Sequence, residues 1–259
     1  MDHRIAAVED NLDGFFDRMR GHELLTDTST SDVLSVHSDI PFPMFNAVGH
    51  ARFGADAERR TREVAAEFID RGLPWLWWLT PSGNAPGTEE VLTGLGLHHQ
   101  PIPGMHRPLD EAPAVPLPDG VTLELVPASD TAFIDTLLAG FGMPELVREP
   151  LARLEEVFAP GDYVSLLARL DGVPVGCGSG FVHDGVLGVY NIATLEEARG
   201  RGIGYAVTAA LLAEGRRRGC RHTVLHATEA GRPVYERLGF ETVCDVPQYV
   251  WLPDEEPQG

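Results

Sequence analysis

The sequence predicts a mixed α/β protein in which helices flank twisted sheets that are mostly antiparallel. Three observations support this fold class. In the second half, two Asp-Gly pairs separate three apolar stretches, which is typical of strands joined by tight hairpins. A glycine-rich turn then leads from the last of these strands into a helix. A similar order of helix, strand and short helix occurs in both halves of the 259-residue chain.

The first half alternates between helical and extended patterns. Apolar residues recur at helical spacing over residues 5–20 and 56–71, and a shorter helix is expected over 88–94. Strands are expected over residues 33–37, 44–53, 73–79 and 98–109. The strand at 73–79 is apolar throughout, which predicts burial on both faces. Its three tryptophans are therefore expected in the core, in preference to a ligand cleft.

Proline density marks the boundary between the two halves. Six prolines lie between residues 101 and 118, and such density is typical of an extended linker. We therefore expect one domain over residues 1–110, a linker over 111–119 and a second domain over 120–259.

The second half begins with a strand over residues 121–126. A helix over 129–138, with Ser129 as its cap, and another helix ending near Phe158 are expected next. The three hairpin strands cover residues 163–170, 173–183 and 185–194. The helix after the glycine turn ends at three arginines followed by Gly219, which is a common helix stop. A strand over 222–226, a short helix over 234–240 and a last strand to about Trp251 complete the chain.

The glycine-rich turn reads Arg199-Gly200-Arg201-Gly202-Ile203-Gly204. A helix that begins on glycines offers free backbone N–H groups and the positive end of its dipole, which together suit a phosphate. Glycine also lets a ligand approach the main chain closely. By itself, the turn is equally consistent with an ordinary connection between a strand and a helix.

Two motifs in order resemble those of the GNAT superfamily of acyl-CoA-dependent N-acetyltransferases. The first is Arg199-x-x-Gly202-x-Gly204, and the second, about a helix and a strand later, is Tyr235-Glu-Arg-Leu-Gly-Phe240. The resemblance covers roughly residues 121–251. Residues 71–97 repeat the order of elements around the second motif, with Leu92 in the place of Tyr235. The resemblance therefore implies two GNAT-like domains, of which the first is degenerate and lacks the glycine loop.

The resemblance implies acetyl-CoA as cosubstrate and assigns residues to its binding. The backbone of residues 200–205 would hold the pyrophosphate, with Arg199 and Arg201 adding positive charge. The pantetheine arm would pair like an extra strand with Ile192-Ala193-Thr194, where a backbone N–H would stabilise the oxyanion. The cofactor-binding residues that the resemblance implies are Ile192, Ala193, Thr194, Arg199, Gly200, Arg201, Gly202, Ile203, Gly204 and Tyr205.

Tyr235 matches the family position for the general acid that protonates the departing thiolate. A phenol keeps its proton at pH 7, so Tyr235 can donate it. His226 is a candidate base, although a histidine on a strand is more often a packed or surface residue. Phe141, Met143 and Phe158 could contact the acceptor, and packing explains them equally well. Glu196 and Glu197 fit a solvated turn better than a site for a cationic acceptor.

Composition narrows the class of partner. The net charge is −19 and every basic side chain apart from histidine is arginine, so the surface repels nucleic acids and anionic lipids. The same charge would attract a cationic amine, although solubility alone also explains it. The three cysteines and the histidines form no metal-ligand pattern, so no metal is expected. Without a signal core or a membrane-spanning run, the chain is expected to be cytoplasmic, as a monomer or a homodimer.

These features predict an acetyl-CoA-dependent N-acetyltransferase that acts on a primary amine of a small molecule. Acetylation of a protein amino group is an alternative within the same chemistry. A non-catalytic acyl-CoA-binding module, whose first half contacts a partner, is an alternative of another class. The intact Tyr235 favours the enzyme.

Overall fold

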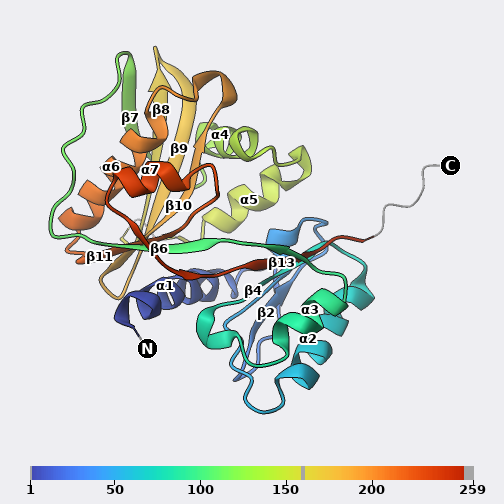
Figure 1. Ribbon diagram of the computed structural model, residues 1–259. Helices are drawn as coiled ribbons and strands as arrows, with labels where there is room; N and C mark the ends of the chain where they lie inside the picture. The colour runs from blue at the N-terminus through green and yellow to red at the C-terminus, as the bar shows by residue number, and fades with distance from the viewer. Residues whose placement is uncertain (1, 159–160, 254–259) are drawn as a thin grey trace. The chain divides into compact units, whose positions relative to one another are not determined.

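The computed structural model describes residues 2–158 and 161–253, and the chain forms two compact units (Figure 1). Unit 1 consists of Met1–Arg18 and Gly104–Val243, and unit 2 of Met19–Pro103 and Cys244–Gly259. The expected domains began and ended at residues 1 and 259, which lie outside the described residues. The expected boundary at 111–119 divides the sequence into two halves, but each unit also contains a segment from the other side of this boundary.

Unit 1 is built on a seven-stranded sheet in the order β12-β6-β11-β10-β9-β8-β7. All of its determined strand pairs are antiparallel except β10 with β11. Its strands are β6 (Pro103–Pro108), β7 (Val121–Val126), β8 (Tyr163–Leu170), β9 (Val173–His183), β10 (Val186–Thr194), β11 (His222–His226) and β12 (Glu241–Asp245). The two predicted Asp-Gly hairpins are confirmed, because Asp171, Gly172, Asp184 and Gly185 all have positive φ.

Helices cover both faces of the unit 1 sheet. In Figure 1, α4 and α5 lie on one side of β8, β9 and β10, while α6 and α7 lie on the other. The helices are α1 (His3–Met19), α4 (Thr131–Phe141), α5 (Arg148–Glu155), α6 (Ile203–Arg217) and α7 (Arg232–Arg237). The cap of α4 is Asp130, whose carboxylate accepts from the Phe133 amide at 3.0 Å. The expectation of Ser129 as cap is therefore wrong by one residue; both side chains suit the position.

Unit 2 is built on a six-stranded sheet in the order β1-β2-β3-β4-β13-β5. Its strands are β1 (Thr26–Asp27), β2 (Leu34–His37), β3 (Ala47–Gly49), β4 (Trp75–Trp78), β5 (His98–Gln100) and β13 (Gln248–Trp251), and its helices are α2 (Ala57–Arg71) and α3 (Thr88–Gly94). Trp75 and Trp77 are fully buried in its core, as the apolar run predicts. The expected extended segment 44–53 is wrong in part, because Pro43–Phe45 is a short 3-10 helix before β3.

Each half of the sequence contributes a strand to the sheet of the other unit. The strand expected over 98–109 is two strands, of which β5 pairs with β13 in unit 2 and β6 with β11 in unit 1. The last strand is likewise split, and β13 pairs with β4 and β5. Prolines cause both breaks, since Pro101 and Pro247 have no N–H for a ladder. In Figure 1, the red β13 lies beside the much earlier β4.

The two sheets follow the same plan, which supports the internal repeat that the sequence predicts. β6 is inserted between β11 and β12, and β13 is inserted between β4 and β5 in the same way. β3 and β4 pair in parallel, as do β10 and β11. In each unit the crossover between the parallel strands contains a 15-residue helix, α2 or α6.

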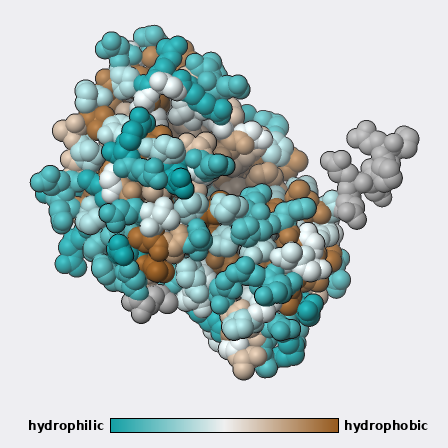
Figure 2. All heavy atoms as spheres, viewed as in Figure 1, coloured by the Kyte–Doolittle hydropathy of each residue, from teal (hydrophilic) through white to brown (hydrophobic). Residues whose placement is uncertain are grey.

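The surface is largely polar, in keeping with the charge of the chain. On the face in Figure 2, hydrophilic residues predominate over both units and hydrophobic residues occur in small groups. Among the helices of the described part, none has both the length and the apolar character needed to cross a bilayer.

Candidate active site

The glycine-rich turn connects β10 to α6 in unit 1. A short 3-10 helix (Glu196–Ala198) follows β10, and Arg199 is extended. Gly200 and Gly202 then have φ of 75° and 80°, a region that residues with a Cβ rarely occupy. Gly202 stands at the N-cap position of α6, and because glycine has no side chain it cannot accept from any helix donor. The two glycines therefore set the path of the turn and leave the helix end open.

The backbone amides of this turn are free to bind a ligand. Arg199 N–H donates to the Glu196 carbonyl at 3.2 Å, and Ala206 N–H donates to the Gly202 carbonyl at 3.0 Å. Between them, the amides of residues 200–205 donate no hydrogen bond to any described protein group. Six donors thus remain at the positive end of a 15-residue helix, which is a geometry that suits phosphate oxygens.

The two arginines of the turn differ in their surroundings. The Nε of Arg199 donates to the Thr194 carbonyl at 3.2 Å, so this side chain ties the turn back to the end of β10. Arg201 is exposed at the mouth of the turn. Arg201 is therefore the better placed of the two to supply charge to an anion.

The strand β10 has one unpaired edge beside the turn. Its parallel pairing with β11 ends at Val189↔Leu225, although β10 continues to Thr194. The pairing with β9 shifts register between Tyr190 and Ala193, and Asn191 has a φ of 57°. This β-bulge lies next to the segment Ile192-Ala193-Thr194 that the sequence singles out. The segment therefore has backbone groups on the β11 side for another extended chain to pair with.

Tyr235 lies on α7 with its ring in the core of unit 1. It is 8% exposed, and its ring meets that of Phe240 edge-on at 6.1 Å. Burial raises the pKa of Tyr235 to about 12, and its hydroxyl donates no hydrogen bond within the described residues. On the same helix, the Arg237 guanidinium lies 5.5 Å from the ring centre of Tyr205 in the first turn of α6. This cation–π contact holds α7 against the helix that begins at the glycine turn.

His226 ends β11, close to the point where β10 and β11 separate. Its ring centre lies 6.5 Å from that of Tyr190. Burial lowers the pKa of His226 to about 4, so the imidazole is neutral at pH 7. A neutral imidazole can accept a proton, but one with this pKa is a weak base.

The other residues considered from the sequence are in varied environments. Phe141 is 47% exposed at the end of α4, and Glu196 and Glu197 are exposed on the 3-10 helix. Phe158 is buried and stacks on the ring of Tyr163 at 4.3 Å. No group of three or more His, Cys, Asp or Glu residues in the described ranges is arranged to hold a metal ion.

Asn191 and Glu155, which no sequence motif indicated, meet behind the bulge. Asn191 Nδ2 lies 3.4 Å from Glu155 Oε1, 36 residues away in the chain. An asparagine within an otherwise apolar strand is a signal that could have drawn attention to the bulge. Nothing in the sequence around Glu155 distinguishes it from the exposed Glu156 beside it.

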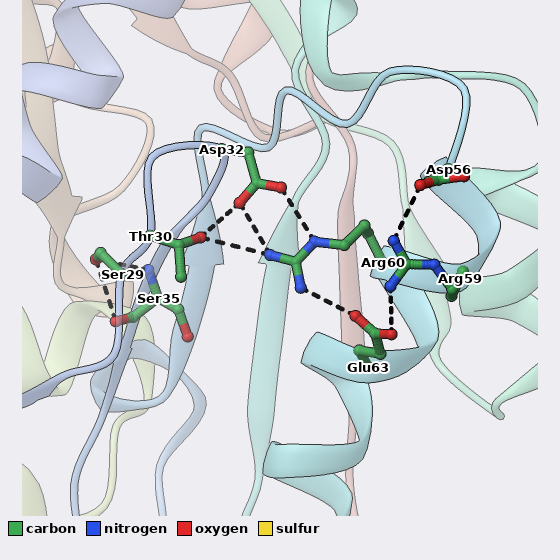
Figure 3. Close-up of polar contacts among 8 residues, drawn as sticks. All are labelled: Ser29, Thr30, Asp32, Ser35, Asp56, Arg59, Arg60 and Glu63. Carbon is green, nitrogen blue, oxygen red and sulfur yellow. Dashed lines mark hydrogen bonds and ion pairs between the residues drawn. The ribbon is translucent and has the colours of Figure 1, made fainter.

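Unit 2 has ion pairs where unit 1 has its open turn. At the start of α2, Asp56 binds Arg59, and Asp32 binds Arg60 at 2.9 Å (Figure 3). Glu63 bridges both arginines, one turn further along the helix. This end of α2 has no glycine turn, and the carboxylates of Asp56 and Glu58 beside it would repel a phosphate. The arrangement supports the prediction that the first half is degenerate.

Comparison with known protein families supports the assignment of unit 1. Residues 132–240 match the model of the acetyltransferase (GNAT) family. The match includes the glycine-rich turn, the bulge of β10 and the segment from Tyr235 to Phe240. No curated protein sequence matches the chain.

Solved structures share the fold of both units. A GCN5-related N-acetyltransferase from Kribbella flavida aligns with a TM-score of 0.71 at 18% identity, over 96% of either chain. A GCN5-related N-acetyltransferase from Sphaerobacter thermophilus has a TM-score of 0.59 at 19% identity, over 85% of this chain and 80% of its own. A conserved protein of unknown function from Staphylococcus epidermidis has a TM-score of 0.60 at 14% identity, over 87% of this chain and 93% of its own.

Proposed function

Residues 132–240 belong to the acetyltransferase (GNAT) family, and on this premise we propose that the protein transfers an acetyl group from acetyl-CoA to a primary amine of a small molecule. The observation that carries the proposal is the run of unengaged amides over residues 200–205. The six N–H groups, the dipole of α6 and Arg201 would hold the pyrophosphate of CoA. Because these donors belong to the backbone, they bind without ordering flexible side chains.

The pantetheine arm would lie along the unpaired edge of β10. It carries amide groups, and Ile192-Ala193-Thr194 offers backbone partners on the side from which β11 has separated. The Thr194 carbonyl already accepts from Arg199, so the arm would pair through the remaining groups. A backbone N–H of this segment would polarise the thioester carbonyl and stabilise the oxyanion formed on attack.

Tyr235 would donate a hydrogen bond to the sulfur as the thiolate leaves. Its pKa of about 12 keeps the phenol protonated at every physiological pH. The phenol is also a weaker acid than the thiol it helps to form, which titrates at roughly 8.5. Complete transfer of the proton from the phenol is therefore uphill even to the full thiolate, so Tyr235 would act as a hydrogen-bond donor to the negative charge that develops on sulfur. His226 is a candidate for the base that takes the proton of the amine, although its pKa of about 4 makes it a weak one.

The acidic surface supports an acceptor with positive charge. A net charge of −19 raises the local concentration of cationic amines and disfavours nucleic-acid partners. Acetylation of a protein amino group is the second candidate within this chemistry. Peptides are therefore included among the acceptors tested below.

The phosphate-binding site at residues 200–205 is tested by a variant that changes its charge without straining the backbone. Gly204 lies in the first turn of α6 without positive φ, and an added Cβ would make only ordinary contact with Thr194, at 3.5 Å. Gly204→Asp puts a carboxylate among the free amides, where it favours the helix but repels pyrophosphate. We expect calorimetry to give a Kd for CoA at least about tenfold weaker, equivalent to ~1.4 kcal/mol. Gly94→Asp, at an exposed glycine of unit 2, is the control.

Thiol release from acetyl-CoA, measured against metabolite amines, antibiotics and peptides, tests the reaction itself. Equal CoA affinity in Gly204→Asp and the wild type would contradict phosphate binding by the amides of residues 200–205. Tight binding without thiol release for any acceptor would favour the non-catalytic acyl-CoA-binding module instead.

A further inference from the structure

A cluster of polar side chains is buried behind the bulge of β10. Asn191 Nδ2 lies 3.1 Å from Ser179 Oγ, 3.3 Å from Tyr163 Oη and 3.4 Å from Glu155 Oε1. The Tyr163 hydroxyl also donates to Ser179 Oγ at 2.8 Å. Glu155, in the last turn of α5, is 4% exposed. The cluster therefore joins a buried acid directly to the residue that forms the bulge.

One oxygen of Glu155 is bonded and the other is not. Oε1 accepts from Asn191, whereas Oε2 is buried without a hydrogen-bond partner among the described residues. A buried acceptor without a partner destabilises the fold by about 1–3 kcal/mol, and more when it is charged. Oε2 is therefore available to a group that is not part of the protein.

A column of aromatic rings lies beside this cluster. Tyr190 stacks on Phe15 at 4.4 Å, Phe15 on Phe158 at 4.9 Å, and Phe158 on Tyr163 at 4.3 Å. The four rings form a continuous column contributed by α1, β8, β10 and the segment after α5. Burial raises the pKa of Glu155 to about 7, although hydrogen bonds with Tyr163 and Asn191 favour the charged form. The carboxyl is therefore divided between its two protonation states near neutral pH.

The position of the cluster relates Glu155 to the reaction. Asn191 immediately precedes Ile192-Ala193-Thr194, where the proposed function seats the pantetheine arm and the thioester. On that proposed function, we propose that Glu155 is the general base, and that its Oε2 takes the proton from the acceptor amine beside the bulge. It would do so directly or through one water molecule.

Protons and electrons balance in this scheme. The ammonium form of the acceptor gives one proton to Glu155, and the nitrogen lone pair then forms the C–N bond. The C–S bond breaks with its electron pair on sulfur, and the thiolate accepts a hydrogen bond from Tyr235. The second proton lost by nitrogen neutralises the thiolate, directly or through the hydroxyl of Tyr235. One proton is released overall, and it leaves from Glu155 to solvent.

The titratable groups around the cluster keep their protonation state over the working range. Burial raises the pKa of Tyr163 on β8 and of Tyr190 on β10, and raises that of Cys177 on β9 to about 12. His226 on β11 has a pKa of about 4. Asp13 on α1 faces Tyr190 as a nearby negative charge. Between pH 5 and 9, Glu155 is the member of this set that changes charge.

The test compares kcat/KM for thiol release between pH 5 and 9 in the wild type, Glu155→Gln and Glu156→Gln. Glu156 is the matched control, because it is the next residue and is exposed. The ratio of wild-type to Glu155→Gln rates cancels the titration of the amine. We expect this ratio to rise with a midpoint near pH 7 and to reach roughly 10²-fold or more. Glu156→Gln should follow the wild type.

Tyr163→Phe provides a second test that does not depend on the folding of Glu155→Gln. It removes a hydroxyl that favours the charged form of the Glu155 carboxyl, so the rise of the pH–rate profile should move to higher pH. The proposal would be overturned if the ratio of wild-type to Glu155→Gln rates does not change with pH. It would also be overturned if the pH–rate profile of Tyr163→Phe matches that of the wild type. A wild-type rate ratio that is already level at pH 5 would be the result expected for His226 as the base, since its pKa is about 4. A wild type that binds CoA but releases no thiol would refute the proposed function, and this inference with it.

Discussion

Burial raises the pKa of two side chains at the site with opposite consequences for their reactivity. For Tyr235, a pKa of about 12 means that the proton is retained and is difficult to give away. For Glu155, a pKa of about 7 brings the carboxyl to the range in which a base works efficiently at neutral pH. The same desolvation therefore makes the phenol a hydrogen-bond donor and the carboxyl a proton acceptor. Burial of these two side chains thus assigns the donor role to Tyr235 and the base role to Glu155 in the proposed reaction.

The role of Tyr235 predicts a specific loss of turnover. Tyr235→Phe keeps the ring in the core but removes the donor to sulfur, so kcat should fall by roughly 10²–10⁴-fold. The Kd for acetyl-CoA, measured by calorimetry, should stay near the wild-type value. Tyr249→Phe is the control, because it removes a hydroxyl from a tyrosine that is equally buried but lies in unit 2. Unchanged kcat under conditions where chemistry limits the rate would contradict the assignment.

The position of the glycine turn depends on how closely α6 packs on β9. Gly176, Gly178 and Gly180 lie on the face of β9 that meets α6 and the side chains it covers. A Cβ on Gly176 would lie 2.9 Å from Ile203, the first residue of the helix. The missing side chains therefore let the helix approach the sheet closely at the end where the amides are exposed.

This packing predicts that one added methyl group destabilises unit 1. In Gly178→Ala, the new Cβ would lie 2.7 Å from Val207 and also meet Ile192. Val207 is β-branched and has one preferred rotamer in a helix, so it cannot turn away cheaply. We expect a loss of about 1–3 kcal/mol in the free energy of unfolding by urea.

Gly94→Ala is the control for this measurement, because an added Cβ there has no neighbour within 4 Å. It should leave stability unchanged or raise it slightly, by up to about 1 kcal/mol. Equal unfolding free energies for the two variants would show that α6 can move away from β9 without cost.

Each half of the sequence completes the sheet that the other half mainly builds. β13 lies between β4 and β5, so residues near the end of the sequence fill the middle of the sheet built by the first half. Tyr249 on β13 is 2% exposed in the unit 2 core, and its hydroxyl donates to Glu89 at 3.2 Å. A defect in either half of the sequence is therefore expected to affect the unit that the other half mainly builds.

This exchange predicts that a substitution near the C-terminal end unfolds the unit built by the first half. All four tryptophans, at positions 75, 77, 78 and 251, belong to unit 2, so their fluorescence reports on that unit. Tyr249→Ala should lower its stability by about 3–5 kcal/mol, since it leaves a large cavity in the core. Tyr249→Phe loses only one hydrogen bond and should cost about 0.5–1.5 kcal/mol. A tryptophan transition that Tyr249→Ala leaves unchanged would argue against the insertion of β13.

Features whose causes are local could be predicted from the order of residues alone. Gly200 and Gly202 impose the path of the turn through their own backbone angles, and the Asp-Gly pairs do the same for the two hairpins. Tertiary structure decided the features that need partners from distant segments. Pro101 and Pro247 marked breaks in two strands, but a proline does not specify which sheet the next strand joins.

The proposed base has the same kind of origin. Glu155 looks like its exposed neighbour in the sequence, and it becomes a buried acid only because α5 carries it into the interior of unit 1 beside Asn191. Desolvation is a property of the surroundings and not of the residue, so the sequence could supply the anion-binding turn while only the folded chain could select the carboxylate.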